Sequence, residues 1–247
     1  MDTLEIFTRE GFAYLSRWAH FLVGITWIGL LYYFNFVQVP AFAEMSAEGR
    51  SEALRRVTWR ALWWFRWGAL LTVLTGFLIL GFNERLERDY FTTIPGTVIA
   101  GGAILGIIMF LNVWLVIWPA QQVAIGSAET VAGGGEANPQ AAGAARRAGL
   151  ASRANTLFSI PMLFFMGATT HLAASSHFVN DASNDSLAAY WIIFTVLVGA
   201  IELDALGVVG TAAHWTKAPF DSIRGVLISG FVLTAVLYAV VEFLFQA

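Results

Sequence analysis

The chain has 247 residues, of which 57% are hydrophobic and 13% are charged, and its mean hydropathy is +0.66. This composition lies outside the range of soluble globular domains and indicates an integral membrane protein. The formal net charge of -3 gives no support for nucleic-acid binding. The absence of cysteine excludes disulfides, thiolate-ligated metal centres and covalent c-type haem attached through C-x-x-C-H.

Six apolar stretches are long enough to cross a bilayer, which takes about 20 helical residues. We therefore predict an all-α integral membrane protein, a single domain over residues 1–247, with six spans near 13–37, 61–82, 95–118, 155–174, 188–209 and 224–245. The fourth stretch contains Pro161, which is tolerated near the start of a helix. The alternative for this stretch is a short interfacial segment.

Two of the connections have a recognisable composition. Residues 119–154 are rich in Gly and Ala and are expected to form a flexible cytoplasmic loop. Residues 44–60 are expected to form a short amphipathic helix that leads into the second span.

The distribution of Lys and Arg predicts the orientation, because positively charged loops stay in the cytoplasm. One side collects Arg50, Arg55, Arg56, Arg60, Arg66, Arg146, Arg147, Arg153, Lys217 and Arg224, whereas the other has Arg9, Arg17, Arg85 and Arg88. The chain is therefore expected in a bacterial inner (cytoplasmic) membrane, with contacts to lipid and with both termini in the periplasm.

Two histidines fall inside the predicted spans at similar depth on the same side. His20 lies about six residues into the first span, and His171 lies about four residues from the outer end of the fourth, so both are roughly 6–9 Å deep. Titratable groups in a bilayer are costly, which makes each histidine a candidate functional residue. A facing imidazole pair suggests a metal centre, with a haem iron held by His20 and His171 as the first hypothesis. The alternatives are interhelical hydrogen bonds, or a role in binding a substrate or moving protons.

A second polar layer lies towards the predicted cytoplasmic side. Its members are all polar or charged residues within spans: Arg66, Asn112, Asn155, Glu202 and Asp204. A lone carboxylate at this depth would be protonated or paired, and Arg66 is the expected partner of Glu202 or Asp204. A buried ion pair that fixes helix register and a catalytic or proton-relay role both remain open.

Three segments of the chain resemble a known family. The runs RWAHFLVGITWIGLLYYF, FLNVWLVIWPAQQ and SRANTLFSIPMLFFMGATTH are similar to the membrane domain of bacterial urate hydroxylases, the cytochrome c-linked urate oxidases. The similarity covers most of the chain and marks His20, Asn112, Trp118, Gln121, Asn155 and His171 as the positions to examine.

The resemblance implies substrate oxidation coupled to a cytochrome. In that family the membrane domain usually precedes a cytochrome c domain, but this chain has no C-x-x-C-H and fewer predicted spans. Electrons are therefore expected to pass to a separate c-type cytochrome, through a His-ligated haem b. Two other functions stay open: a haem b electron-transfer subunit without substrate turnover, and a non-catalytic accessory subunit of a larger membrane complex.

Overall fold

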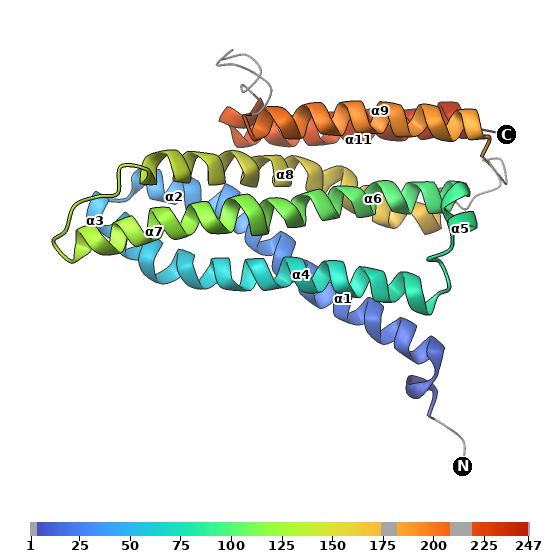
Figure 1. Cartoon of the computed structure of the whole chain (residues 1–247), viewed down its shortest axis with the longest axis horizontal. Helices are drawn as coiled ribbons and strands as arrows, with labels where there is room; N and C mark the ends of the chain where they lie inside the picture. The colour runs from blue at the N-terminus through green and yellow to red at the C-terminus, as the bar shows by residue number, and fades with distance from the viewer. Residues whose placement is uncertain (1–3, 174–181, 208–218, 247) are drawn as a thin grey trace.

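The computed structural model describes residues 4–173, 182–207 and 219–246, and every element in these ranges is a helix. The helices join into long rods that run roughly along one axis of the molecule (Figure 1). This confirms the predicted all-α membrane bundle.

The first three rods are longer than a bilayer requires. They are α1 (Arg9–Tyr32), η2 (Tyr33–Gln38) and α2 (Val39–Glu44); α3 (Ala47–Ala53), η3 (Leu54–Thr58) and α4 (Trp59–Phe82); and α6 (Ile94–Leu111), η4 (Asn112–Ile117) and α7 (Trp118–Ala132). In each rod the η segment is a π-helical stretch. The rods therefore extend past the apolar segments at the end that carries α2, α3 and α7. The expected helix over 44–60 is confirmed by α3 and η3.

The remaining rods are single helices. They are α8 (Ala141–His171), α9 (Asn184–Ala205) and α11 (Ile223–Phe245), and two short helices, η1 (Glu5–Phe7) and α5 (Arg88–Thr92), precede α1 and α6.

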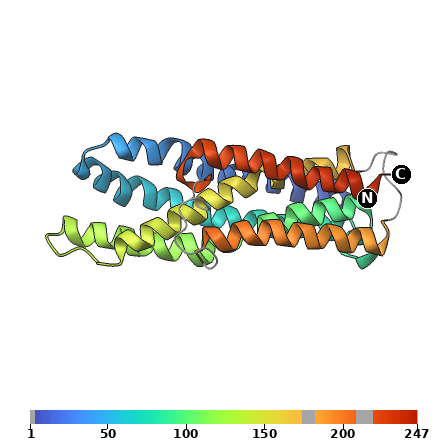
Figure 2. The same cartoon turned by 90° about the horizontal axis from the view of Figure 1, so that it is seen from above.

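Helix α8 lies at the centre of the arrangement. It packs along α6 and α7 on one side and against α11 on another, and α9 lies next to α11 in the same layer (Figures 1 and 2). Helices α1 and α4 pack together on the far side of this core, and α1 moves away from α8 towards Arg9 (Figure 1). The start of α1 and the end of α11 lie at the same end of the molecule.

Four of the rods begin with the same local pattern, a Ser or Thr followed three residues later by Gly. The caps are Thr8–Gly11, Ser46–Gly49, Thr93–Gly96 and Ser222–Gly225, in each of which the side-chain oxygen accepts a hydrogen bond from the glycine N–H. The glycine is needed where the incoming chain folds back on the helix. A Cβ at position 96 would lie 1.8 Å from the carbonyl oxygen of Tyr90, which no side chain can tolerate.

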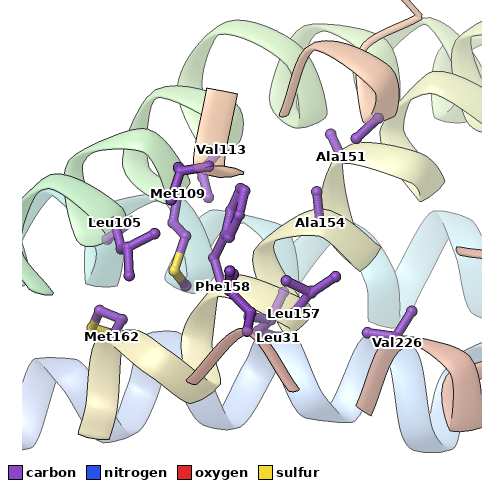
Figure 3. Packing of buried hydrophobic residues seen from close by; sticks show 14 of the residues in the cluster. Leu31, Leu105, Met109, Val113, Ala151, Ala154, Leu157, Phe158, Met162 and Val226 are labelled. Carbon is purple, nitrogen blue, oxygen red and sulfur yellow. The ribbon is translucent and has the colours of Figure 1, made fainter. Parts of the chain in front are cut away.

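The core is built around one face of α8. Its buried residues recur at alternating spacings of four and three, which keeps them on one helix face: Ala144, Ala148, Ala151, Asn155, Phe158, Met162 and Phe165. Leu105, Met109 and Val113 of α6 and η4 and Leu31 of α1 pack against this face (Figure 3). The small alanines allow α7 to approach closely, whereas the aromatic and thioether side chains fill the wider part of the bundle.

Five rods of the described chain are long and apolar enough to cross a membrane: Arg9–Glu44, Ala47–Phe82, Ile94–Ala132, Asn184–Ala205 and Ile223–Phe245. Each contains one of the predicted spans, or most of it where the predicted 188–209 runs past the described residues. Helix α8, which holds the described part of the predicted span 155–174, is not among the five. Its apolar character is diluted by buried polar residues such as Asn155, Thr156 and Ser159, whose side chains face protein and not lipid. Pro161 lies inside α8, which continues past it to His171.

The prediction of a flexible loop over 119–154 is wrong for most of that range. Helix α7 reaches Ala132 and α8 begins at Ala141, so residues 133–140 alone connect them. The physical reason is that alanine is the best helix former, and here it also supplies the close contact between α7 and α8. The composition resembled that of a linker, but the four-three spacing of the alanines is that of a buried helix face.

Candidate functional site

Asn112, Asn155 and Glu202 form a hydrogen-bonded cluster where three helical segments meet. The Asn112 amide donates through Nδ2 to Asn155 Oδ1 at 2.9 Å and to Glu202 Oε2 at 3.2 Å. The Asn155 amide donates in turn to the carbonyl oxygen of Met109 at 2.9 Å. Asn155 is 0% exposed and Asn112 is 3% exposed, so the bonds lie inside the protein. Three of the five residues in the predicted polar layer therefore come together.

The position of Asn112 depends on the π-helical stretch that it opens. Pro119 follows η4, and a proline has no N–H to offer the carbonyl oxygen four residues earlier, at Leu115. The backbone hydrogen bond at this point spans five residues and not four, since the Trp118 N–H bonds to the carbonyl oxygen of Val113. The same arrangement occurs in η2, which contains Asn35. Pro40 lies shortly after η2, and the Val39 N–H bonds to the carbonyl oxygen of Phe34, five residues back. Single π-helical turns are frequent at functional sites.

Polar contacts continue along α8 from this cluster to α1. The Asn35 amide donates to Ser152 Oγ at 2.9 Å, and the hydroxyls of Tyr32 and Ser159 lie 2.9 Å apart. The sequence analysis did not single out Tyr32, Ser152 and Ser159. Two serines and an asparagine, Ser152, Asn155 and Ser159, recur at spacings of three and four along α8, and this spacing was the signal that could have found the serines.

Arg66 does not pair with a carboxylate. Its guanidinium carbon lies 3.8 Å from the ring centre of Trp118, 4.9 Å from that of Trp114 and 5.4 Å from that of Trp67. The Trp114 indole also donates to the Arg66 carbonyl oxygen at 3.2 Å. Within the described residues Arg66 makes no ion pair, so the predicted pairing with Glu202 or Asp204 is wrong. Stacking on indole faces stabilises the cation without a second buried charge, although its buried Nε has no hydrogen-bond partner among the described residues.

Glu202 and Asp204 both lie half-buried near the end of α9. Glu202 turns to Asn112, as described above. Asp204 is two residues further on. Gln121, marked by the family resemblance, lies half-buried on α7 beyond Trp118.

His20 lies in the contact between α1 and α4. Its Nδ1 is 3.0 Å from Thr75 Oγ1, and its Cε1 lies 3.4 Å from the place that a Cβ on Gly76 would take. Gly24 faces Thr72 of α4 in the same contact. The helices therefore fill the space around this histidine.

His171 is exposed at the last turn of α8, and the described structure does not join it to His20 by any hydrogen bond. The hydrogen bonds from α1 and η2 to α8 are at Tyr32 and Asn35, and α1 diverges from α8 towards its own start (Figure 1). The contact of His20 Nδ1 with Thr75 leaves Nε2 as the nitrogen that an iron would take, and the shared haem stays a prediction.

The fold and these contacts define a multi-pass, all-α membrane protein with a buried cluster of amides and one carboxyl between its helices. Residues 84–203 match the family model described as urate oxidase N-terminal, so this part of the chain is similar to a urate-hydroxylase-like membrane domain. The match includes Asn112, Asn155, His171 and Glu202 and leaves out His20 and Arg66. No curated protein and no solved structure matches the chain.

Proposed function

We propose that this chain is the membrane-embedded oxidoreductase domain of a urate-hydroxylase-type system in a bacterial inner membrane. An anionic purine of the urate class binds at the Asn112–Asn155–Glu202 cluster, and its electrons pass to a separate c-type cytochrome. The cytochrome docks in the periplasm, at the end of the bundle where α1 begins and α11 ends.

The observation that carries this proposal is the position of the cluster. Its three side chains come from η4, α8 and α9, and all three lie inside the segment that matches the urate oxidase N-terminal family model. Amide side chains both donate and accept, as do the N–H and C=O edges of an oxidised purine. In the described structure these groups bond to one another, so a bound purine would replace the Asn112–Asn155 and Asn112–Glu202 hydrogen bonds with bonds of its own.

The chemistry requires a proton acceptor as well as an electron acceptor. Hydroxylation of urate by water places the water oxygen on a ring carbon and releases two electrons and two protons. The electrons reduce two one-electron cytochromes, and the Glu202 carboxylate is the group in the cluster that can take one of the protons. The second proton passes to water.

Haem b is the redox centre that the sequence predicts, with His20 and His171 as its ligands. His20 and His171 would hold the haem, which would supply one-electron chemistry, and no step is assigned to it here. A reduced-minus-oxidised visible spectrum of the purified protein tests the prediction, with His20→Ala and His171→Ala alongside. A b-type spectrum lost in both variants would mean that α1 and the end of α8 come together in the haem-loaded protein.

The function itself is tested by urate-dependent reduction of added cytochrome c in detergent or liposomes. We expect reduction by the wild-type protein and a loss of at least tenfold in Asn155→Ala and Glu202→Gln, because each removes one side of the cluster. Matched controls are Asn35→Ala, a buried amide outside the cluster, and Glu129→Gln, an exposed carboxylate on α7. Both should keep their activity.

Two other results would replace the proposal. A b-type spectrum without urate turnover would make the chain an electron-transfer subunit. Absence of any chromophore and of turnover, together with a stably bound partner protein, would make it an accessory subunit.

A further inference from the structure

A cleft opens between η3 and α7, away from the Asn112 cluster. It has a volume of about 320 Å³ and is lined by Arg55, Trp59, Gln122, Ile125, Gly126 and Glu129. All six residues lie outside the apolar spans predicted from sequence, at the end of the bundle opposite to the termini. The cleft therefore faces water next to the membrane surface.

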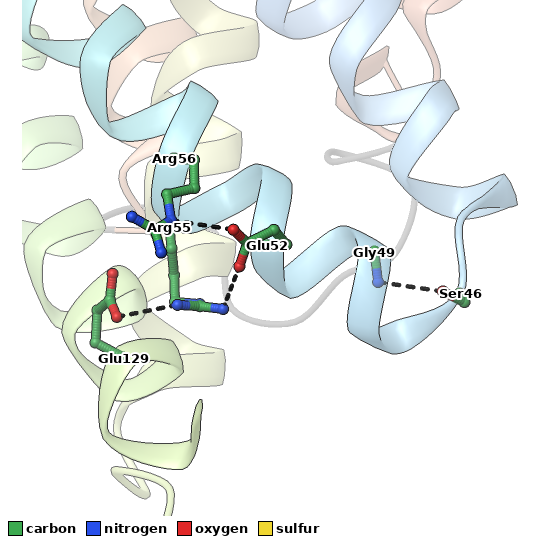
Figure 4. Close-up of polar contacts among 6 residues, drawn as sticks. All are labelled: Ser46, Gly49, Glu52, Arg55, Arg56 and Glu129. Atoms are coloured by element: carbon green, nitrogen blue, oxygen red, sulfur yellow. Dashed lines mark hydrogen bonds and ion pairs between the residues drawn. The ribbon is translucent and has the colours of Figure 1, made fainter. Parts of the chain in front are cut away.

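Arg55 forms the charged wall of this cleft. Its side chain is 15% exposed, and it bonds through Nη1 to Glu129 at 3.2 Å and through Nη2 to Glu52 (Figure 4). Its Nε is buried and has no hydrogen-bond partner among the described residues. Glu129 is 54% exposed, so its carboxylate can turn out into water when another anion reaches Arg55. Once Glu129 has turned away, Arg55 Nη1 is the donor that a planar oxygen acceptor in the cleft can take.

Trp59 forms the aromatic wall. Its ring stacks on Trp118 with 5.0 Å between centroids and 27° between planes, and the Arg66 guanidinium lies 3.8 Å from the centre of Trp118. Two groups this close cannot share one ring face, so Trp118 lies between Arg66 and Trp59. The groups therefore stack in the order Arg66 guanidinium, Trp118 indole and Trp59 indole, followed by the cleft. The Arg66 guanidinium lies at the far end of this stack. Its positive charge favours the binding of an electron-rich ring against the Trp59 indole.

The opposite side of the cleft leaves room for a flat ligand. Ile125 is buried and supplies an apolar floor, and a Cβ added to Gly126 would meet no atom within 4 Å. Gln122 adds an amide that can donate or accept at the rim. The walls thus offer a ring face, a guanidinium and an amide around an open slot.

We propose that this cleft binds a planar, anionic heterocycle, stacked on Trp59 with an oxygen on Arg55. The inference rests on the proposed function, because urate, the substrate proposed there, is the ligand used to test the cleft. It adds a site on the water-exposed end of the bundle that is separate from the cluster in the membrane.

The test measures urate binding to the detergent-purified full chain by titration calorimetry. Gly126→Leu fills the slot without meeting neighbouring atoms, and Arg55→Gln removes the guanidinium. Gly143→Leu is the matched control, since Gly143 on α8 also has open space around a built Cβ. Thermal unfolding and size-exclusion profiles establish that each variant is folded.

We expect urate affinity at this site to fall at least tenfold in Gly126→Leu and Arg55→Gln and to be unchanged in Gly143→Leu. Equal affinity in folded Gly126→Leu would overturn the proposal, as would a wild-type protein that binds no urate. Binding of tetramethylammonium in place of urate, lost in Gly126→Leu, would also overturn it and assign the cleft to organic cations held by Trp59 and Glu129. Cytochrome reduction is measured separately from urate binding. If no reduction is observed, the proposed function fails, whereas the effect of Gly126→Leu on urate binding still tests the cleft.

Discussion

The Asn112 side chain donates to Asn155 at 2.9 Å across the contact between η4 and α8, and its second amide hydrogen reaches Glu202 on α9. One amide thus holds three segments together inside an apolar bundle. Because both of its donors are used, replacing either partner leaves a buried N–H without an acceptor.

The first prediction concerns the stability of this junction. Asn155→Ala should lower the free energy of unfolding by about 1–3 kcal/mol, the cost of leaving the Asn112 donor and the Met109 carbonyl unpaired. Thermal or denaturant unfolding in a fixed detergent measures it. Asn83→Ala, which removes an amide bonded to its own helix near the end of α4, should cost less than half as much. An unchanged free energy of unfolding in Asn155→Ala would show that water or lipid replaces the lost hydrogen bonds.

The second prediction concerns Arg66, which stacks on tryptophans and pairs with no carboxylate. Arg66→Ala should cost about 0.5–2 kcal/mol, and Arg66→Lys should recover part of this because an ammonium keeps the charge but not the flat face. In a double-mutant cycle with Glu202→Gln the two losses should add to within about 0.5 kcal/mol. A larger coupling energy would be evidence for the ion pair that the described structure lacks.

The third prediction concerns the Thr93–Gly96 cap. Gly96→Ala places a Cβ 1.8 Å from Tyr90 O, so the turn before α6 must move, at a cost of about 1–3 kcal/mol or loss of folded protein. Gly126→Ala is the control, because its Cβ meets open space and alanine favours the helix by up to about 1 kcal/mol. Equal unfolding temperatures for the two variants would refute the argument.

The fourth prediction concerns Pro119 and the π-helical stretch. Pro119→Ala restores an N–H to the helix and should let η4 return to regular α-helical bonding, which stabilises the rod. The same change rotates Asn112 away from Asn155, so urate-dependent cytochrome reduction should fall while the unfolding temperature rises. A parallel loss or a parallel gain of both quantities would count against a functional role for the π-helical turn.

The fifth prediction concerns orientation. With ten Lys and Arg on one side and four on the other, an alkaline phosphatase fused after Ala247 should be active and a fluorescent protein at the same place should be dark. Reporters inserted at residues 133–140, between α7 and α8, should give the reverse pattern. Activity of the fluorescent fusion at the C-terminus would invert the topology and place the Arg55 cleft outside the cell.

The sequence was sufficient for the class of the protein and for much of its polar inventory. Runs of about 20 apolar residues force helices, because backbone groups inside lipid must be hydrogen-bonded within their own segment. The same cost of burying polar groups pointed to Asn112, Asn155 and Glu202 before any contact was visible. The helical state of residues 141–154 was also encoded, in the spacing of Ala144, Ala148 and Ala151, but composition alone concealed it.

Only the tertiary structure decided which of these groups meet. A helix period tells how residues are arranged around one axis, whereas contacts between helices depend on the rotation, tilt and local bonding of each rod. The π-helical turn at η4 turns Asn112 towards α8 and α9, and it leaves Trp114 and Trp118 facing α4 and Arg66. The tilt of α1 likewise carries the start of this helix away from α8 (Figure 1). Depth follows from counting residues, but partners follow from how the helices pack.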